Sequence, residues 1–272
     1  MTTNILSRSR IRLPRFEYGE ITRNHVLTAR DHYLVACVHE HRFIRSTHLA
    51  ALAESSIQVT NNRLKILHHK WHFLQRPKVQ KRYYVAGSQP LAYSITQAGL
   101  KYLGIEGRVK DAEKHPSHHL FEHTMQTTDF MVMMELSARK RGVEFERLPI
   151  EPWRASAVHL GRRHEQGIKP DAVFRLNNKY FALEADTGEM ALQRTDWFKQ
   201  NCIEKKQVLY KALKRPFSNL RVIFFTSENG RKERMKALLP SPMFLYISKG
   251  DIETVLNADL FNYNWDSPLV DF

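Results

Sequence analysis

The sequence has little cysteine and no long apolar run. Its 272 residues include only Cys37 and Cys202, which lie far apart. This spacing excludes a disulfide framework and a cysteine-rich zinc site, and it is typical of a reducing cytoplasm. No stretch of about 18 apolar residues occurs, so we expect no membrane insertion. The opening residues MTTNILSRSRIRLPRF also lack the apolar core of a signal peptide.

Acidic residues are scarce in the first part of the chain. Residues 1–110 hold 18 Lys and Arg against 6 Asp and Glu, whereas residues 111–272 hold 24 against 22. This shift predicts a domain boundary near residue 110. A basic half also predicts a phosphate-backbone partner, so we expect double-stranded DNA.

A basic arm, residues 1–26, precedes the first expected helix. It carries four arginines: Arg8, Arg10, Arg12 and Arg15. The arm either lies along DNA or remains a solvated tail.

Residues 27–110 contain three segments with helical spacing of apolar residues. They cover residues 27–44, 46–55 and 60–74, with Ser46 or Thr47 and then Thr60 as the expected N-caps. A strand, a basic turn and a second strand are expected in FLQRPKVQKRYYVAG (73–87), before the helix of YSITQAGLKYL.

This order resembles winged helix-turn-helix proteins. The resemblance implies that Thr96 caps the last helix and that Gly99 allows close packing. It also implies groove reading by four residues of the third helix, Asn61, Asn62, Arg63 and Lys65. Phosphate contacts would come from three residues of the wing, Lys78, Lys81 and Arg82. A winged helix used for protein contacts is the alternative.

The segment IKPDAVFRLNNKYFALEADTG, residues 168–188, predicts a β-hairpin with three acids. A two-residue turn at Asn177-Asn178 places Asp171 opposite Glu184, and Asp186 then shares the side of Glu184. We expect one face of the hairpin to be core and the other to gather the carboxylates. Such crowding favours a divalent-cation site, Mg²⁺ or Mn²⁺, over a solvated polar face. Glu122 or Glu151 would complete it.

The second half predicts a helix at 118–141, three strands, a helix at 192–213 and a strand at 221–227, followed by a short helix and a final strand. This order resembles the PD-(D/E)XK nuclease-like fold, so we expect a mixed α/β (α+β) chain with a restriction-endonuclease-like domain over residues 111–272. Pro170-Asp171 and Glu184 match the motif, but Asp186 stands where that family has a lysine. Lys206 would compensate, with Lys199 or Lys205 as alternatives.

A basic winged helix followed by KPDAVFRL and ALEADTGE resembles the replication-relaxation family, especially the MOB-C type of plasmid relaxase. The pair His123 and Asp129 is similar to that family's first helix. The resemblance implies a metal-dependent endonuclease that nicks one strand at a plasmid transfer origin, with relaxosome or coupling proteins as partners. Asp171, Glu184 and Asp186 would bind the metal, and Tyr210 is the first tyrosine to consider if cleavage is covalent.

Three other interpretations remain open. The chain could be a non-catalytic DNA-binding regulator with a degenerate nuclease fold, or a nuclease of mobile-element defence or transposition. A short H-x-x-E-H match, which spans His119, Glu122 and His123, would instead suggest a metalloprotease.

Overall fold

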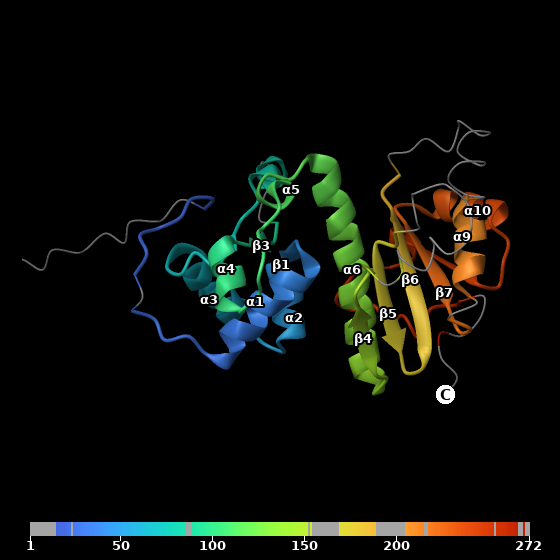
Figure 1. The fold of residues 1–272 in the computed structure, drawn as a ribbon, viewed down its shortest axis with the longest axis horizontal. Helices are drawn as coiled ribbons and strands as arrows, with labels where there is room; N and C mark the ends of the chain where they lie inside the picture. The colour runs from blue at the N-terminus through green and yellow to red at the C-terminus, as the bar shows by residue number, and fades with distance from the viewer. Residues whose placement is uncertain are drawn as a thin grey trace, which may run out of the picture. The chain divides into compact units, whose positions relative to one another are not determined.

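A computed structural model describes residues 15–22, 24–84, 89–151, 153, 169–188, 205–214, 217–252, 254–265 and 269. The chain divides into two compact units, an N-terminal unit of residues 1–118 and a C-terminal unit of residues 119–272 (Figure 1). The mixed α/β prediction is confirmed, since helices accompany both a three-stranded and a five-stranded sheet. Among the described residues, no helix is long and apolar enough to cross a membrane.

The N-terminal unit packs helices around a small antiparallel sheet of order β1-β3-β2. Its elements are, in chain order, α1 Ala29–His41, β1 Ile44–Arg45, α2 Ser46–Leu52, α3 Ile57–His69, β2 Leu74–Gln75, the 3-10 helix η1 Lys78–Tyr84, β3 Ala92–Ile95, α4 Gln97–Tyr102 and α5 Asp111–Lys114.

Helix starts in this unit follow from side-chain capping. Thr28 and Asp31 form a reciprocal capping box at α1, which satisfies backbone N–H groups that the first turn leaves without partners. Ser56 caps α3, so the prediction of Thr60 as its N-cap is wrong. Thr60 lies inside the helix and is fully buried. The expected cap at Thr96 is confirmed, since its Oγ1 accepts from the Gly99 N–H at 3.1 Å.

Gly99 allows the start of α4 to press against the chain at Phe73. A Cβ atom at Gly99 would lie 2.3 Å from the carbonyl oxygen of Phe73, a contact that no side chain can make. The close packing expected at this glycine is therefore confirmed.

The basic wing differs from the expected hairpin. Residues Lys78–Tyr84 form a 3-10 helix where the second strand was predicted, and β2 pairs instead with β3, through Leu74 with Ile95 and Gln75 with Ser94. A buried amide explains this arrangement, since Gln80 exchanges two hydrogen bonds with the backbone of Ala92, at 2.8 and 2.9 Å. That side chain ties η1 to the edge of β3.

The C-terminal unit is built on a five-stranded sheet of order β4-β5-β6-β7-β8. The first three strands run antiparallel, and β6, β7 and β8 run parallel. Its elements are α6 His118–Arg141, β4 Phe145–Leu148, β5 Ala172–Leu176, β6 Lys179–Asp186, α9 Lys205–Leu213, β7 Arg221–Thr226, α10 Asn229–Leu238, β8 Phe244–Ser248 and the 3-10 helix η3 Lys249–Asp251. Residues 192–204 of the helix expected at 192–213 lie outside the described residues.

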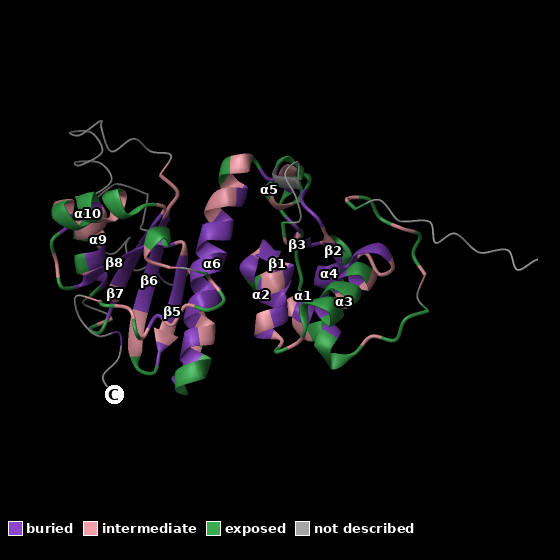
Figure 2. Cartoon of the chain, turned by 180° about the vertical axis from the view of Figure 1, so that it is seen from behind, coloured by how far each residue is buried: buried purple, intermediate pink, exposed green. Residues whose placement is uncertain are grey.

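Both faces of this sheet are buried. Helix α6 covers one face, where Phe130 and Met134 pack on Phe174. Helices α9 and α10 cover the other, where Tyr210 and Met235 join a second core (Figures 1 and 2). Parallel strands need cover on both faces, which explains the apolar runs of β7 and β8.

The register of the β5–β6 hairpin agrees with the prediction. Ala172 pairs with Leu183 and Phe174 with Phe181, as a two-residue turn requires. Asn177 supplies the positive φ, at 48°. The backbone N–H of Asp171 donates to the carbonyl oxygen of Leu183 at 2.9 Å, which extends the ladder to the acidic end of the hairpin.

The aromatic C-terminal segment docks on the core of its own unit. Leu260 is buried, and Trp265 donates its indole N–H to the carbonyl oxygen of Leu260 at 2.6 Å. Asp259 pairs with Arg141 at the end of α6. This segment therefore completes the α6 face of the sheet.

Candidate functional site: an acidic centre at the end of β6

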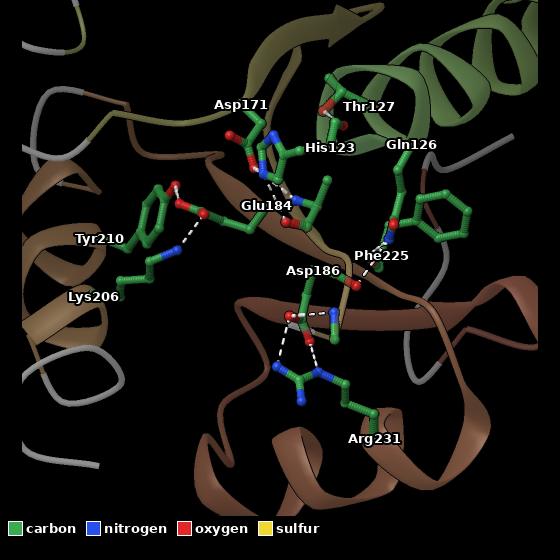
Figure 3. Close-up of polar contacts among 12 residues, drawn as sticks. His123, Gln126, Thr127, Asp171, Glu184, Asp186, Lys206, Tyr210, Phe225 and Arg231 are labelled. Atoms are coloured by element: carbon green, nitrogen blue, oxygen red, sulfur yellow. Dashed lines mark hydrogen bonds and ion pairs between the residues drawn. The ribbon is translucent and has the colours of Figure 1, made fainter. Parts of the chain in front are cut away.

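Two of the three predicted acids meet beside α6 and α9. Asp171 lies directly before β5, and Glu184 lies near the end of β6, on the neighbouring strand (Figure 3). Asp171 bonds to the backbone at Leu183 and Ala185, the residues on either side of Glu184, so the two acids are neighbours. We call Asp171, Glu184 and the three side chains that contact them, His123, Lys206 and Tyr210, the acidic centre.

Asp171 is held by the backbone of β6 and by α6. Its Oδ2 atom accepts from the Ala185 N–H at 2.8 Å and lies 3.3 Å from His123 Nε2. The same imidazole nitrogen is 3.1 Å from the carbonyl oxygen of Ala185. The hydrogen bond to Asp171 raises the pKa of His123 and outweighs the opposite effect of partial burial.

Glu184 is only 5% exposed and is held by two side chains of α9. Lys206 pairs with its Oε2 atom, and Tyr210 donates its hydroxyl to Oε1 at 2.5 Å (Figure 3). Lys206 and Tyr210 are four residues apart, so they share one helix face. Burial raises the pKa of Glu184, and Lys206 opposes that shift. Burial also raises the pKa of Tyr210 well above its ordinary value.

Asp186 does not join the other two acids. Both of its oxygens face Arg231 of α10, with Oδ1 accepting from Nη2 at 2.7 Å and Oδ2 pairing with Nε. Oδ1 also accepts from the Gly188 N–H at 3.3 Å. These contacts tie the end of β6 to α10, and Asp186 lies apart from Asp171 and Glu184 in Figure 3.

The centre offers hard oxygen donors but few of them. The carboxylates of Asp171 and Glu184 and the carbonyl oxygen of Ala185 are the ligand types that Mg²⁺ takes in proteins. Within the described ranges, no three His, Cys, Asp or Glu side chains group closely enough to hold a metal ion by themselves. From the described residues, a cation here would take the carboxylates of Asp171 and Glu184 and complete its shell with water or phosphate.

The other acids and lysines proposed for the centre are placed less favourably. Glu122 lies on α6 one residue before His123, and it is His123 that contacts Asp171. Glu151 is exposed. Lys205 begins α9, and Lys199 lies outside the described residues. The imidazole of His119 lies 6.2 Å from that of His123, whose Nε2 faces Asp171, so the protease interpretation gains no support.

The N-terminal unit exposes three of the four predicted groove-reading residues. Asn61, Asn62 and Lys65 are exposed on α3. Arg63 instead turns toward α1, where its Nε donates to Asp31 Oδ1 at 2.8 Å. Placing Arg63 on the outer face was wrong, because the buried Asp31 carboxylate needs a cation. His69 of α3 is buried.

The three predicted phosphate-contact residues are exposed on η1. They are Lys78, Lys81 and Arg82. The ammonium group of Lys81 lies 5.4 Å from the ring centroid of Phe16. This contact joins η1 to Phe16, which lies in the basic arm. Arg8, Arg10 and Arg12 lie outside the described residues.

Two contacts of the acids were missed by sequence reasoning. His123 was noted for its spacing from Asp129 and as part of the H-x-x-E-H match, and its position near the start of the long α6 was the available signal for its contact with Asp171. Arg231 carried no signal, because its pairing with Asp186 depends on how α10 packs after β7. Lys206, the first candidate to compensate for the missing lysine of the motif, pairs with Glu184, and its role in cleavage stays a prediction.

A family model described as replication-relaxation matches residues 35–208. The chain belongs to the replication-relaxation family. The matched span runs from α1 through Asp171 and Glu184 to Lys206, so it includes the acidic centre. Membership indicates a role in plasmid replication or mobilisation. No curated protein and no solved structure matches the chain.

Proposed function

We propose that this replication-relaxation protein binds double-stranded DNA at a transfer origin and nicks one strand in a metal-dependent step, as a relaxase of the MOB-C type. The observation that carries this proposal is geometric: Asp171 bonds to the β6 backbone at Leu183 and Ala185, on either side of Glu184, and Glu184 pairs with Lys206. Two carboxylates and a lysine on neighbouring elements are what phosphodiester cleavage by a PD-(D/E)XK-like centre requires.

DNA binding is assigned to the N-terminal unit. Its order of helices and strands, with β1 and β2 on either side of β3, supports a winged helix. Asn61, Asn62 and Lys65 on α3 offer amides and a cation for base edges and phosphates. The exposed cations of η1 would contact phosphate without reading sequence.

The acidic centre would position the scissile phosphate and its cation. Asp171 and Glu184, with the Ala185 carbonyl, would hold Mg²⁺ or Mn²⁺, which when bound polarises the phosphate and lowers the pKa of water. Lys206 is 41% exposed on its side chain and pairs with Glu184, so its charge can also face an incoming phosphate. Tyr210 is fully buried, and its hydroxyl orients Glu184. That position suits a supporting role rather than that of a nucleophile.

The test is nicking of supercoiled plasmid that carries the element's own transfer origin, with Mg²⁺ or Mn²⁺ and again with EDTA. We expect conversion to the open-circular form only with metal. Asp171→Asn and Glu184→Gln should each lower the rate at least a hundred-fold while duplex affinity stays within two-fold. Glu144→Gln is the matched control, because Glu144 is an exposed acid that pairs with Arg175 on the same unit.

A non-catalytic DNA-binding regulator is the second candidate. The observation in its favour is that every acid of the hairpin end already has a protein partner, since Asp171 faces His123, Glu184 faces Lys206 and Asp186 faces Arg231. Specific duplex binding without nicking in any metal would select this function and exclude the relaxase.

A further inference from the structure

The N-terminal unit holds a pocket of about 400 Å³ in which three cations and several polar side chains lie beside apolar residues such as Ile57 and Leu91. Its volume falls in the range of pockets that hold small ligands. The cations are Arg15, Lys65 and Arg76, and no Asp or Glu occurs among the described residues that line it. Asn61 and Asn62 of α3 also line the pocket. Such a lining selects an anion.

Arg76 is the group that makes this pocket unusual. It is only 8% exposed, although a guanidinium keeps its charge at any physiological pH. Its contacts are with neutral groups: Nη1 donates to the Arg15 carbonyl oxygen at 2.6 Å and lies 3.4 Å from His69 Nε2, and the guanidinium carbon lies 5.2 Å from the Tyr93 ring centroid. In the described part of the unit, its Nε has no hydrogen-bond partner.

A buried charge without a counter-charge is costly, so the surroundings of Arg76 call for an anion. The neighbouring imidazole does not provide one, since it is neutral or positive. Burial, reinforced by the charge of Arg76, lowers the pKa of His69 to about 4, which keeps that ring neutral at physiological pH. Among the described residues no carboxylate pairs with Arg76, so an anionic ligand that enters the pocket would supply the counter-charge.

The pocket is continuous with the surface assigned to DNA. Asn61, Asn62 and Lys65 are exposed and form its rim on α3. Arg15 also lines it, and Arg15 is one of the four arginines of the basic arm. A duplex that binds α3 would bring its backbone phosphates to this rim. Binding of free phosphate would not require the basic arm or the two amides.

We propose that this pocket seats one backbone phosphate of bound DNA, with Arg76 as its central cation. The inference rests on the proposed DNA-binding role and is independent of nicking. It adds Arg76 and Arg15 to the DNA-binding residues. Because Arg76 would contact phosphate and not bases, its loss should lower the affinity for all duplexes equally.

The test is fluorescence anisotropy with the full chain, using an origin duplex and an unrelated duplex over a range of salt concentrations. Arg76→Met should weaken binding to both duplexes about ten-fold and make the slope of log affinity against log salt shallower by about 0.9, as one lost phosphate contact predicts. Arg76→Lys should recover part of the affinity. Arg30→Met, an exposed arginine on α1, is the matched control and should change neither quantity.

A second variant covers the case in which Arg76→Met does not fold, as judged by thermal unfolding. Asn61→Asp places a negative charge on the exposed rim without disturbing the buried Arg76. It should lower the affinity for both duplexes as well. Unchanged affinity and slope in the folded variants, while wild type binds DNA, would overturn the phosphate seat. Absence of any duplex binding by wild type would instead overturn the proposed function.

Inorganic phosphate and a mononucleotide distinguish the source of the phosphate. We expect neither to raise the melting temperature of wild type below about 10 mM. Saturable stabilisation of wild type at lower concentrations, lost in Arg76→Lys and without effect on DNA affinity, would assign the pocket to a free anion and overturn the DNA seat.

Discussion

Replacing Arg63 by Met should destabilise the N-terminal unit and leave base recognition intact. Asp31 is fully buried, and Arg63 reaches it with two N–H donors, while a third bond goes from Arg63 to the carbonyl oxygen of Val26 at 3.1 Å. Removing one partner of a buried ion pair costs about 3–5 kcal/mol, because the other charge stays buried. Thr28 still donates its N–H and hydroxyl to Asp31, each at 2.8 Å, so we expect about 3 kcal/mol.

A loss of that size is large for this unit. Each kcal/mol shifts the melting temperature of a domain of roughly 100 residues by about 4–8 °C, so the transition should fall by at least about 12 °C. Differential scanning calorimetry of the full chain measures it. Asp31→Asn and the double variant complete a cycle, in which the double variant should lose less than the two single losses added together.

The pH dependence of this effect has a definite sign. Burial alone would raise the pKa of Asp31, but the hydrogen bonds from Arg63 and Thr28 outweigh it and leave the pKa lowered. The carboxylate therefore contributes stability above its unfolded pKa, near 3.9, and that stability is lost as pH falls through the lower folded value. An unchanged melting temperature in Arg63→Met, with a loss of discrimination between duplexes, would refute the stabilising role of Arg63. It would instead support contact of Arg63 with bases in the DNA groove.

Three further predictions concern other contacts. Gly99→Ala should lower the free energy of unfolding by at least about 2 kcal/mol in urea titrations, because its Cβ would meet the Phe73 carbonyl oxygen; an unchanged midpoint would contradict the packing. Arg231→Met should lower the free energy of unfolding by about 3 kcal/mol in the same titration, because Asp186 would lose its only described ion pair. Any nicking activity should persist. Loss of nicking at unchanged stability would instead place Asp186 in the acidic centre. The raised pKa of His123 means that its pairing with Asp171 contributes stability below the unfolded pKa, near 6.5, and that this contribution disappears as pH rises through the folded value. An imidazole titration by NMR should therefore move to lower pH in Asp171→Asn, and no movement would contradict the pairing.

Much of the C-terminal unit was predictable because its signals are local. The Asn177-Asn178 turn fixes the register of the hairpin, and the register in turn places Asp171 beside Glu184. The long apolar periodicity of α6 gave its bounds, His118–Arg141, in full. Lys206 was proposed because the motif lacks its usual lysine, and its pairing with Glu184 depends on how α9 packs on β6.

The errors came from contacts that no local pattern encodes. Asp186 follows Glu184 by two residues and shares its side of β6, but Arg231, 45 positions later, draws it to α10. The wing was predicted to be a β-hairpin because its residues favour strands. In the structure the Gln80 amide binds the Ala92 backbone, and η1 stands in place of the second strand. Arg63 was assigned to DNA by its residue type, and the buried charge of Asp31 decided otherwise.

The most direct test of the account is a Mn²⁺ titration of the full chain with its origin duplex, followed by electron paramagnetic resonance. The account predicts one bound Mn²⁺ in wild type and in Glu144→Gln, and its loss in Asp171→Asn and Glu184→Gln while duplex binding is retained. Equal Mn²⁺ binding by all four proteins, or none by wild type, would contradict a metal centre at Asp171 and Glu184.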